Sequence, residues 1–458
     1  MTNLTRRHLI KYAAAASLPL FLPARIFGAD APSKKVNIGL IGHGWQGGIN
    51  LDSFLAVNEC RVVAVCDVDE NHLTGAVAKV NQKYNDQSCK KYADFRDLIN
   101  DPSIDAVAIC TPDHWHSIPA IMAANAKKDI FCEKPLSHTL AEGIAMVEAS
   151  TRNNRIWQTG SWQRSQTNFR LAAQLVQNGY IGKVSRVEVG LPGGHTDFGG
   201  TGKNTKDEAV PVGIDFDLWT GPAQLMPFNK GRFHKNWRWN YNIGGGQLMD
   251  WIGHHCDIAH WGLANPAFGC GPDDAVGPSE ISATMEFPDP NALWNTAPDY
   301  RAECVYPNDV EVIIGVSGKP RAGKSGNVPS VGPDPTNLAD GTTWFGDKGW
   351  VYVTRGKFEA SNKDWLKEIR EREQQGKLDV TLYKSPGHIQ EFIDSIISRK
   401  RTLTPVEIAH RSQTPGHLAL IAARVGKKLK WDTKTQTFPE SSEATAMLSK
   451  KFRDPWKL

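Results

Sequence analysis

The chain has 458 residues and a formal net charge of +4. Residues 1–31 supply four cations and one acid, so the remainder keeps a net charge of +1. The length predicts two domains of ordinary size, the near-neutral charge gives no basis for a nucleic-acid partner, and no stretch after the N-terminal residues reaches the roughly 20 apolar residues that cross a membrane.

The N-terminus has the features of a twin-arginine export signal. Arg6 and Arg7 precede an alanine-rich apolar run over residues 12–27. This run is interrupted and too short for a confident spanning helix, so we expect an export signal over residues 1–31 rather than an anchor. The expected partner is the twin-arginine export machinery, and the expected location is periplasmic or secreted. Because Pro32 disfavours cleavage directly before it, the alternative is a form that stays tethered to the membrane.

Residues 36–160 alternate short apolar runs with helical stretches, which is typical of a Rossmann-type, doubly wound sheet of parallel strands in an α/β protein. The expected strands are 36–41, 61–66, 106–110, 130–132 and 156–159, and the expected helices are 47–56, 71–83, 116–126 and 139–153. Ligands of such sheets bind beyond the carboxyl ends of the strands. We therefore look for functional residues directly after each strand.

A glycine fingerprint follows the first strand and opens the first helix, which is the context that a dinucleotide-binding motif needs. Gly42 makes the tight turn, Gly44 lets a pyrophosphate approach the backbone, and Gly47 packs the helix on the strand. Asp67 ends the second strand, where a carboxylate binds ribose hydroxyls and repels a 2′-phosphate, so NAD is expected and NADP is disfavoured. The other loop residues expected to contact the cofactor are Trp45 and Gln46.

Two further motifs follow later strands of the same sheet and point to the same crevice. Thr111, Pro112 and His116 belong to the run TPDHWH, and Glu133 and Lys134 open the run EKP. We expect all five to contact the cofactor. The ammonium group of Lys134 could also meet a substrate hydroxyl, and the alternative is an ordinary surface lysine.

Residues 161–435 have more closely spaced strand-like runs, which predict an α+β domain with a large, mostly antiparallel sheet. The expected strands are 184–189, 281–287, 302–306, 310–316 and 350–354. Residues 318–325 match a P-loop pattern, but the Gly- and Pro-rich residues after them cannot form the required helix, so a surface loop is expected. From residue 388 we expect two helices and then an irregular stretch, with residues 436–458 as a tail that wraps back. We also expect a homo-oligomer formed through the C-terminal sheet.

In the second domain, a glycine turn opens a helix that carries Asp250, His254 and Asp257 on one face. A carboxylate beside a histidine orients the ring and raises its basicity, which suits a general base. Two alternatives stay open: a buried, hydrogen-bonded histidine, and a metal held by the three side chains. We expect that no metal is needed. His255 points about a quarter-turn away and is expected to be structural.

Taken in order, GHGWQG, Asp67, TPDHWH, EKP and the segment DWIGH resemble the Gfo/Idh/MocA oxidoreductases. The resemblance implies NAD-dependent oxidation of a sugar or cyclic polyol. It also implies that Lys134 and His254 act on the reacting carbinol, that Asp250 supports them, and that Asp257 contacts the substrate. The C-terminal region looks like that of secreted members of the family.

Together these features predict an exported sugar or glycoside dehydrogenase. Compartments beyond the inner membrane hold no useful pool of free nicotinamide, so the cofactor would be loaded before export, kept and recycled in place. One alternative is a redox-neutral glycosidase or lyase that oxidises a sugar ring transiently. Another is a non-catalytic sugar-binding protein.

Overall fold

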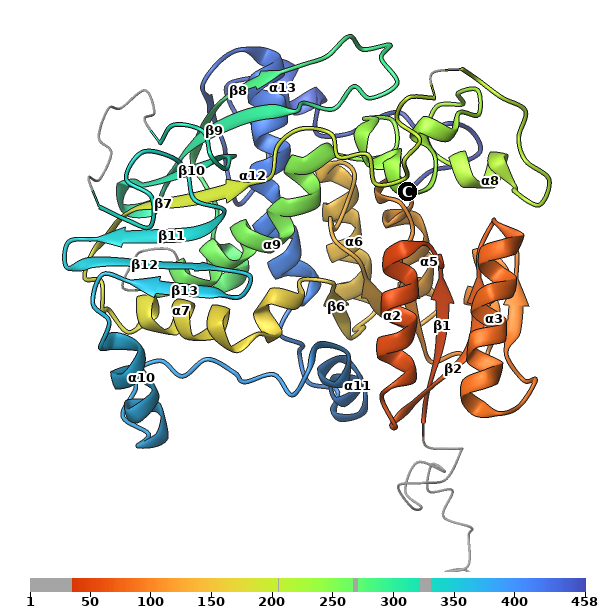
Figure 1. The fold of residues 1–458 in the computed structure, drawn as a ribbon, viewed down its shortest axis with the longest axis horizontal. Coiled ribbons are helices and arrows are strands. Elements are labelled where there is room, and N and C mark those ends of the chain that lie inside the picture. The colour runs from red at the N-terminus through yellow and green to blue at the C-terminus, as the bar shows by residue number, and fades with distance from the viewer. Residues whose placement is uncertain (1–34, 205, 267–270, 322–330) are drawn as a thin grey trace, which may run out of the picture.

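The computed structural model describes residues 35–204, 206–266, 271–321 and 331–458. Two sheets lie on either side of a layer of long helices (Figure 1). The predicted export signal falls on residues outside the described ranges. Within those ranges, no helix has both the length and the apolar character needed to cross a membrane.

The first sheet has six parallel strands in the order β3-β2-β1-β4-β5-β6, which confirms the predicted doubly wound sheet. Its strands are β1 Val36–Ile41, β2 Cys60–Cys66, β3 Lys90–Tyr92, β4 Ala106–Ile109, β5 Asp129–Cys132 and β6 Trp157–Thr159. Its helices are α2 Trp45–Leu55, α3 Glu70–Tyr84, α4 Phe95–Asn100, α5 Ser117–Asn125 and α6 Leu140–Arg152.

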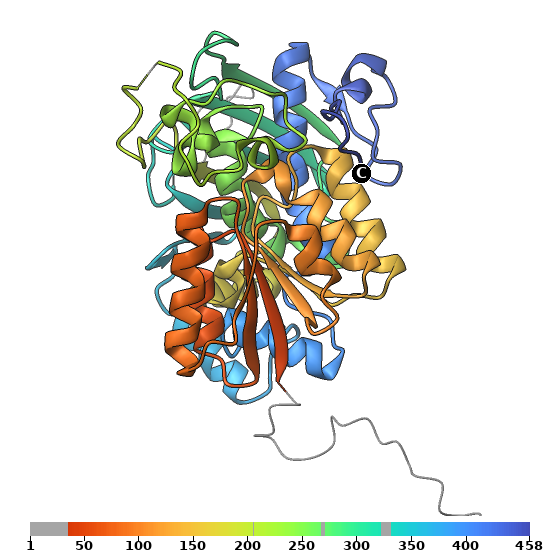
Figure 2. The same cartoon turned by 90° about the vertical axis from the view of Figure 1, so that its right-hand side faces the viewer.

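Helices cover both faces of this sheet (Figure 2), as its Val- and Ile-rich strands require. Helices α2 and α3 pack on one face, and α4, α5 and α6 pack on the other. Helix α11, His388–Ser398, returns from the C-terminal part of the chain, and its Phe392 lies in the same core cluster as Leu40 of β1. The second half of the chain therefore completes the core of the first domain.

The second sheet has eight strands in the order β13-β12-β11-β7-β10-β9-β8-β14 and is antiparallel except between β7 and β10, as predicted. Its strands are β7 Val184–Leu191, β8 Glu280–Glu286, β9 Asp299–Tyr306, β10 Val310–Val316, β11 Gly341–Gly346, β12 Gly349–Thr354, β13 Lys357–Ala360 and β14 Leu429–Lys430. One face packs on α7 Thr167–Gln177, α9 Gly246–Leu263 and α12 Val406–Val425. The remaining helices are α8 Phe216–Thr220, α10 Trp365–Gln374 and α13 Ser442–Ala446.

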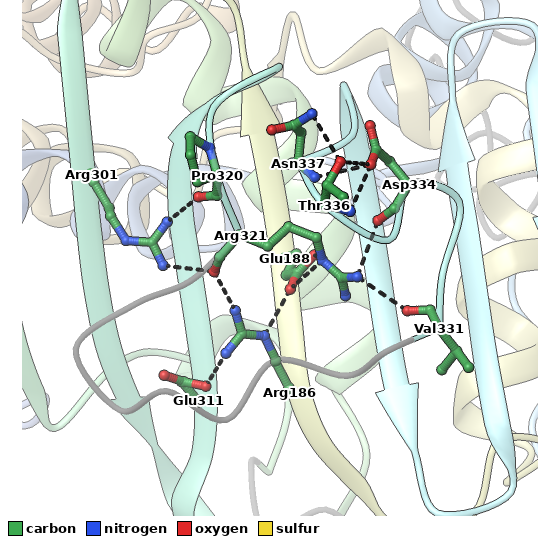
Figure 3. Close-up of polar contacts among 10 residues, drawn as sticks. All are labelled: Arg186, Glu188, Arg301, Glu311, Pro320, Arg321, Val331, Asp334, Thr336 and Asn337. Atoms are coloured by element: carbon green, nitrogen blue, oxygen red, sulfur yellow. Dashed lines mark hydrogen bonds and ion pairs between the residues drawn. The ribbon is translucent and has the colours of Figure 1, made fainter.

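The other face of the second sheet carries a buried network of charged side chains (Figure 3). Arg186 and Glu188 project from β7, and Nε of Arg321 lies 2.9 Å from Oε2 of Glu188. Nη1 of Arg321 also donates to the carbonyl oxygens of Val331 and Asp334. The chain thus covers part of this face itself. Of the P-loop-like run, the residues before 322 form a turn, and the rest falls outside the described residues.

Residues 192–204 and 206–245, here called the covering segment, lie between β7 and α9 in the chain and cover the carboxyl ends of the parallel strands (Figure 1, Figure 2). The C-terminal tail lies beside them. Trp456 packs edge-on against Trp115 with ring centroids 4.8 Å apart, and Arg453 binds Asp217 of α8 at 2.6 Å. The tail therefore joins the covering segment to the first domain.

Candidate active site

A cavity of about 430 Å³ lies at the carboxyl ends of the parallel strands, and residues of the covering segment line part of it. Most of the predicted cofactor contacts line it too, namely Gly42, Gly44, Trp45, Gln46, Asp67, Thr111, Pro112, Glu133 and Lys134. The predicted residues that do not line it are Gly47, His116, Asp250, His254 and Asp257.

The glycine loop leaves room for a pyrophosphate at the start of α2. Gly42 has a φ of +88°, which favours glycine, and a Cβ on Gly47 would lie only 2.1 Å from the Gly42 carbonyl oxygen. A Cβ on Gly44 would meet no atom within 4 Å, although Gly44 lines the cavity. The free amides and dipole of the α2 N-terminus favour an anion in this open space. The loop therefore fits the pyrophosphate of a dinucleotide.

The carboxylate of Asp67 is held by the backbone at the end of β2. Oδ2 accepts from the His43 amide at 2.7 Å, and Oδ1 accepts from the Asp69 amide at 2.9 Å. Oδ1 keeps a lone pair for a ribose hydroxyl, Oδ2 also lies 3.7 Å from Nδ1 of His72, and the negative charge opposes a 2′-phosphate. The geometry therefore favours NAD over NADP.

The motif after β4 lies against the motif after β5. His116 is buried, and its ring nitrogens lie 2.5 Å from the carbonyl oxygen of Pro135 and 2.9 Å from that of Thr111. His116 therefore ties the TPDHWH and EKP motifs together from behind the cavity wall. Glu133 is likewise enclosed, with Oε1 accepting from Nδ2 of Asn50 at 2.8 Å, and burial raises its pKa.

Lys134 connects the cavity to α9. Its Nζ donates to Oδ1 of Asp250 at 2.8 Å and to the Asp250 carbonyl oxygen at 3.0 Å. Nε of Arg238 lies 3.4 Å from the same Oδ1. Although burial alone would raise it, the charges of Lys134 and Arg238 hold the pKa of Asp250 well below its usual range. Gly253 allows this close approach, because a Cβ there would lie 3.2 Å from Cβ of Lys134.

His254 lies one turn after Asp250 and is 8% exposed. Burial, together with the charges of Lys134 and Arg355, holds the pKa of its ring well below the ordinary value. The predicted rise in basicity is therefore wrong, because burial and the two positive charges outweigh the Asp250 carboxylate, which alone would raise the pKa. Within the described part of the chain, Nδ1 of His254 has no hydrogen-bond partner. The ring is neutral, which is the form that accepts a proton.

Asp257 lies away from the cavity, so the structure does not support its predicted contact with substrate. The residue is 1% exposed, and Arg164 binds its carboxylate with Nε at 2.7 Å and Nη2 at 3.0 Å. A bidentate pair of this kind occupies both oxygens. His255 is also fully buried, and it stacks on Trp251 with ring centroids 5.6 Å apart. Of the predicted face of α9, Asp250 contacts the cavity residue Lys134, and His254 lies one turn further along the helix.

The covering segment supplies cavity residues that were not predicted. Trp45 is 51% exposed, and its ring lies 5.5 Å from that of Phe198. Nζ of Lys235 and the guanidinium carbon of Arg238 lie 5.1 Å and 6.0 Å from the Trp45 ring centroid. The run HKNWRW carries a local signal for these cavity residues, because cationic and aromatic residues stand side by side in it.

Asp113 is a further cavity residue that the TPDHWH motif contains and the prediction omitted. One of its oxygens accepts from the Gly245 amide at 3.0 Å, so the motif is fixed to the turn that opens α9. Burial raises the pKa of Asp113 to about 7. Its charge is therefore sensitive to pH near neutrality.

Two family models match the chain. An oxidoreductase family with an NAD-binding Rossmann fold matches residues 36–161, and the C-terminal alpha/beta domain of an oxidoreductase family matches residues 165–267 and 358–458. The chain belongs to the Gfo/Idh/MocA family. Its first domain is accordingly an NAD-binding Rossmann fold, which confirms the cofactor predicted from the glycine loop.

Curated members of the Gfo/Idh/MocA family align with part of this chain. Myo-inositol 2-dehydrogenase of Thermotoga maritima is 36% identical over 148 residues, which are 32% of this chain and 42% of that protein. Levoglucosan dehydrogenase of Pseudarthrobacter phenanthrenivorans is 29% identical over 157 residues, which are 33% of this chain and 39% of that protein. The alignments thus span about two fifths of these relatives.

Solved Gfo/Idh/MocA structures share both domains of the fold. The WlbA dehydrogenase of Bordetella pertussis, solved with NADH and UDP-GlcNAcA, has a TM-score of 0.60 at 16% identity and covers 87% of this chain and 99% of its own. Scyllo-inositol dehydrogenase of Lactobacillus casei, solved with NAD(H) and scyllo-inositol, has a TM-score of 0.54 at 16% identity and covers 87% and 99%. At these identities the match shows the fold alone.

Proposed function

We propose that this protein oxidises a CH–OH group of a sugar, glycoside or cyclic polyol and transfers the hydride to NAD. One observation carries the proposal. The ammonium group of Lys134, a residue that lines the cofactor cavity, is held by Asp250, and a neutral His254 lies one turn further along α9. A fixed cation at the cavity and a proton acceptor one turn further along α9 are the groups that oxidation of an alcohol requires.

Each of the three residues has a separate task. An ammonium group has three N–H donors, and Lys134 uses two of them on Asp250, which leaves one for the oxygen of a substrate hydroxyl. Asp250 stays ionised and keeps Lys134 in place. The neutral ring of His254 takes the hydroxyl proton. When bound, NAD supplies the hydride acceptor.

The cavity wall suits a ring that carries many hydroxyl groups. Trp45 is half-exposed and lines the cavity, and Lys235 and Arg238 hold their cationic groups over its ring. Aromatic faces pack on the apolar faces of sugar rings, while ammonium and guanidinium groups donate to hydroxyl oxygens. The names of the inositol and levoglucosan dehydrogenases indicate substrates of this kind for those relatives.

The proposal includes export and a retained cofactor. Arg6 and Arg7 begin a sequence typical of twin-arginine signals, and a cofactor released outside the cytoplasm would be lost at each cycle. The retained NADH must therefore pass its hydride to the carbonyl group of a second substrate, or return it to the first, before the next cycle. Phe198, His234 and Lys235 of the covering segment line the cofactor cavity and provide contacts that slow release. We further propose that the chain forms a homo-oligomer through the second sheet, which analytical ultracentrifugation of the purified protein would check.

The test uses protein purified from the exported fraction without added nucleotide. It is mixed separately with myo-inositol, scyllo-inositol, levoglucosan, glucose and a set of aryl glycosides while the fluorescence of bound nicotinamide is followed. We expect at least one of these compounds to reduce the bound cofactor and to yield a keto product in mass spectrometry. Cleavage of a glycoside without net reduction would instead support the redox-neutral reaction. Binding of a sugar with neither change would refute an enzymatic role.

A further inference from the structure

Three metal-ligating side chains converge at one edge of the cofactor cavity. Asp69 and His72 lie at the start of α3 in the first domain, and His234 lies on the covering segment. One donor atom from each lies within 4.8 Å of the others, and Oδ2 of Asp69 is 3.4 Å from Nε2 of His234. In the part of the chain that the structure describes, it is the one group of three or more His, Cys, Asp or Glu residues whose donor atoms lie this close together.

The donor set is that of a zinc-type site. Two imidazoles and one carboxylate leave a fourth position for water, and Zn–N and Zn–O distances of about 2.0–2.2 Å place tetrahedral ligands about 3.3–3.5 Å apart. The observed 3.4 Å already matches, and since all three donor atoms lie within 4.8 Å of one another, the other pairs need to close by at most about 1.5 Å. The Asp69 carboxylate is also fixed, because its other oxygen accepts from the Asn71 amide at 2.9 Å and caps α3.

A second carboxylate, that of Asp67, lies beside His72 without being one of the three proposed ligands. Oδ2 of Asp67 lies 3.7 Å from Nδ1 of His72, and a carboxylate beside a ligating imidazole fixes its orientation and strengthens its bond to the metal. The backbone presents His234 in an unusual way, with a φ of +47° that L-residues seldom adopt. The ring of His234 packs against that of His72 with centroids 4.8 Å apart. The two imidazoles thus lie side by side, tilted by 46°, one on the first domain and one on the covering segment.

We propose that Asp69, His72 and His234 bind a divalent transition-metal ion of the zinc class, and that the ion ties the covering segment to the first domain over the bound NAD. The proposed effect of the ion on NAD release follows from where the three residues lie. All three residues line the cofactor cavity next to Asp67, the residue placed to bind the ribose. Movement of the covering segment away from α3 would open this edge of the cavity to let NAD leave, and the metal bridge opposes this movement. This inference does not depend on the substrate or on the catalytic roles of Lys134 and His254.

The test uses full-length protein without an affinity tag, stripped with chelator and titrated with Co²⁺, whose visible absorption reports tetrahedral coordination. We expect stoichiometric binding with tetrahedral absorption bands. His72→Ala and His234→Ala should each weaken binding by about 100-fold, the larger effect seen for loss of metal-site partners. His195→Ala is the matched control, because His195 also lies on the covering segment but bonds to Thr296. Absence of stoichiometric binding, or equal binding by all variants, would overturn the site.

A second measurement tests what the ion does. The rate of NAD release is measured by stopped-flow fluorescence in Zn²⁺ and in chelator, for the unaltered protein and for His234→Ala. We expect Zn²⁺ to slow release at least tenfold in the unaltered protein and to have no effect in the variant. Metal binding without any change in the release rate would show that the three residues form a site that does not hold the covering segment, and would overturn the proposed bridge.

Discussion

At the scale of single residues, we predict that Asp67 decides which dinucleotide the protein accepts. Its carboxylate is fixed by two backbone amides and faces the cavity. Asp67→Ala removes the acceptor for the ribose hydroxyls and the charge that repels a 2′-phosphate. We expect the variant to lose affinity for NAD while its affinity for NADP falls less or rises. Equal changes in both dissociation constants, measured by calorimetry, would contradict this assignment.

Asp113 gives the protein a predictable dependence on pH. Burial raises its pKa from 3.8 to about 7, so the folded state binds more protons than the unfolded state between these values. The free energy of unfolding contributed by this group is therefore fully present below pH 3.8 and is lost as the pH rises through 7. Asp113→Asn keeps an acceptor for the Gly245 amide but cannot ionise. Urea unfolding across this pH range should show a flatter profile for the variant, and parallel profiles would disprove the shift.

The sequence predicted some site residues and missed others for physical reasons. Lys134 could be predicted because it directly follows a strand whose end faces the crevice. The partner of Asp257 could not, because Arg164 lies 93 positions earlier and no local pattern links them. Helix spacing placed Asp250 and His254 on one face, but the two cations that occupy Asp250 come from other elements. Burial of the ring, which a helical pattern does not measure, is the main reason that the pKa of His254 is lowered and not raised as predicted.

At the scale of elements, two glycines near the start of α2 differ in their surroundings: Gly44 lines the cofactor cavity and Gly48 does not. A methyl group on Gly44 would enter open cavity, whereas one on Gly48 would make an ordinary contact at 3.7 Å with His43. We expect Gly44→Ala to fold normally but to lose at least tenfold in NAD affinity, because the methyl group occupies the place of the pyrophosphate. Gly48→Ala is the matched control and should bind NAD normally. Similar NAD affinities for the two variants would place the pyrophosphate elsewhere.

Element boundaries could be predicted where the signal is local. Strands β1 and β10 have the predicted bounds because both are Val- and Ile-rich runs between turns. Strand β3 was missed because its residues, Lys90, Lys91 and Tyr92, are mostly polar and exposed. The packing of α11 on the first sheet was also missed, because it joins segments more than 300 residues apart. Apolar periodicity predicts that a helix has a buried face, but it does not identify the sheet that the face covers.

At the scale of the whole molecule, both domains form the cofactor site, so an exported protein would have to cross the membrane folded and with NAD bound. Residues of both domains line the cavity, and the tail joins the covering segment to the first domain. We expect exported protein, purified without nucleotide, to contain stoichiometric NAD before and after turnover. A dissociation constant near nanomolar, about −12 kcal/mol, would suffice. Protein that emerges empty and works only by consuming free NAD would rule out recycling in place.

The central claim is that Lys134 and His254 act on the substrate while the cofactor stays bound. The most direct measurement is the single-turnover rate of reduction of bound NAD, with a substrate found in the panel above, for Lys134→Met and His254→Ala. Lys83→Met, on the exposed surface of α3, is the control. We predict that both site variants keep their NAD content and fold and lose about 10²–10⁴ in rate, while the control is unchanged. A rate near normal in either site variant, with NAD still bound, would contradict the role proposed for that residue.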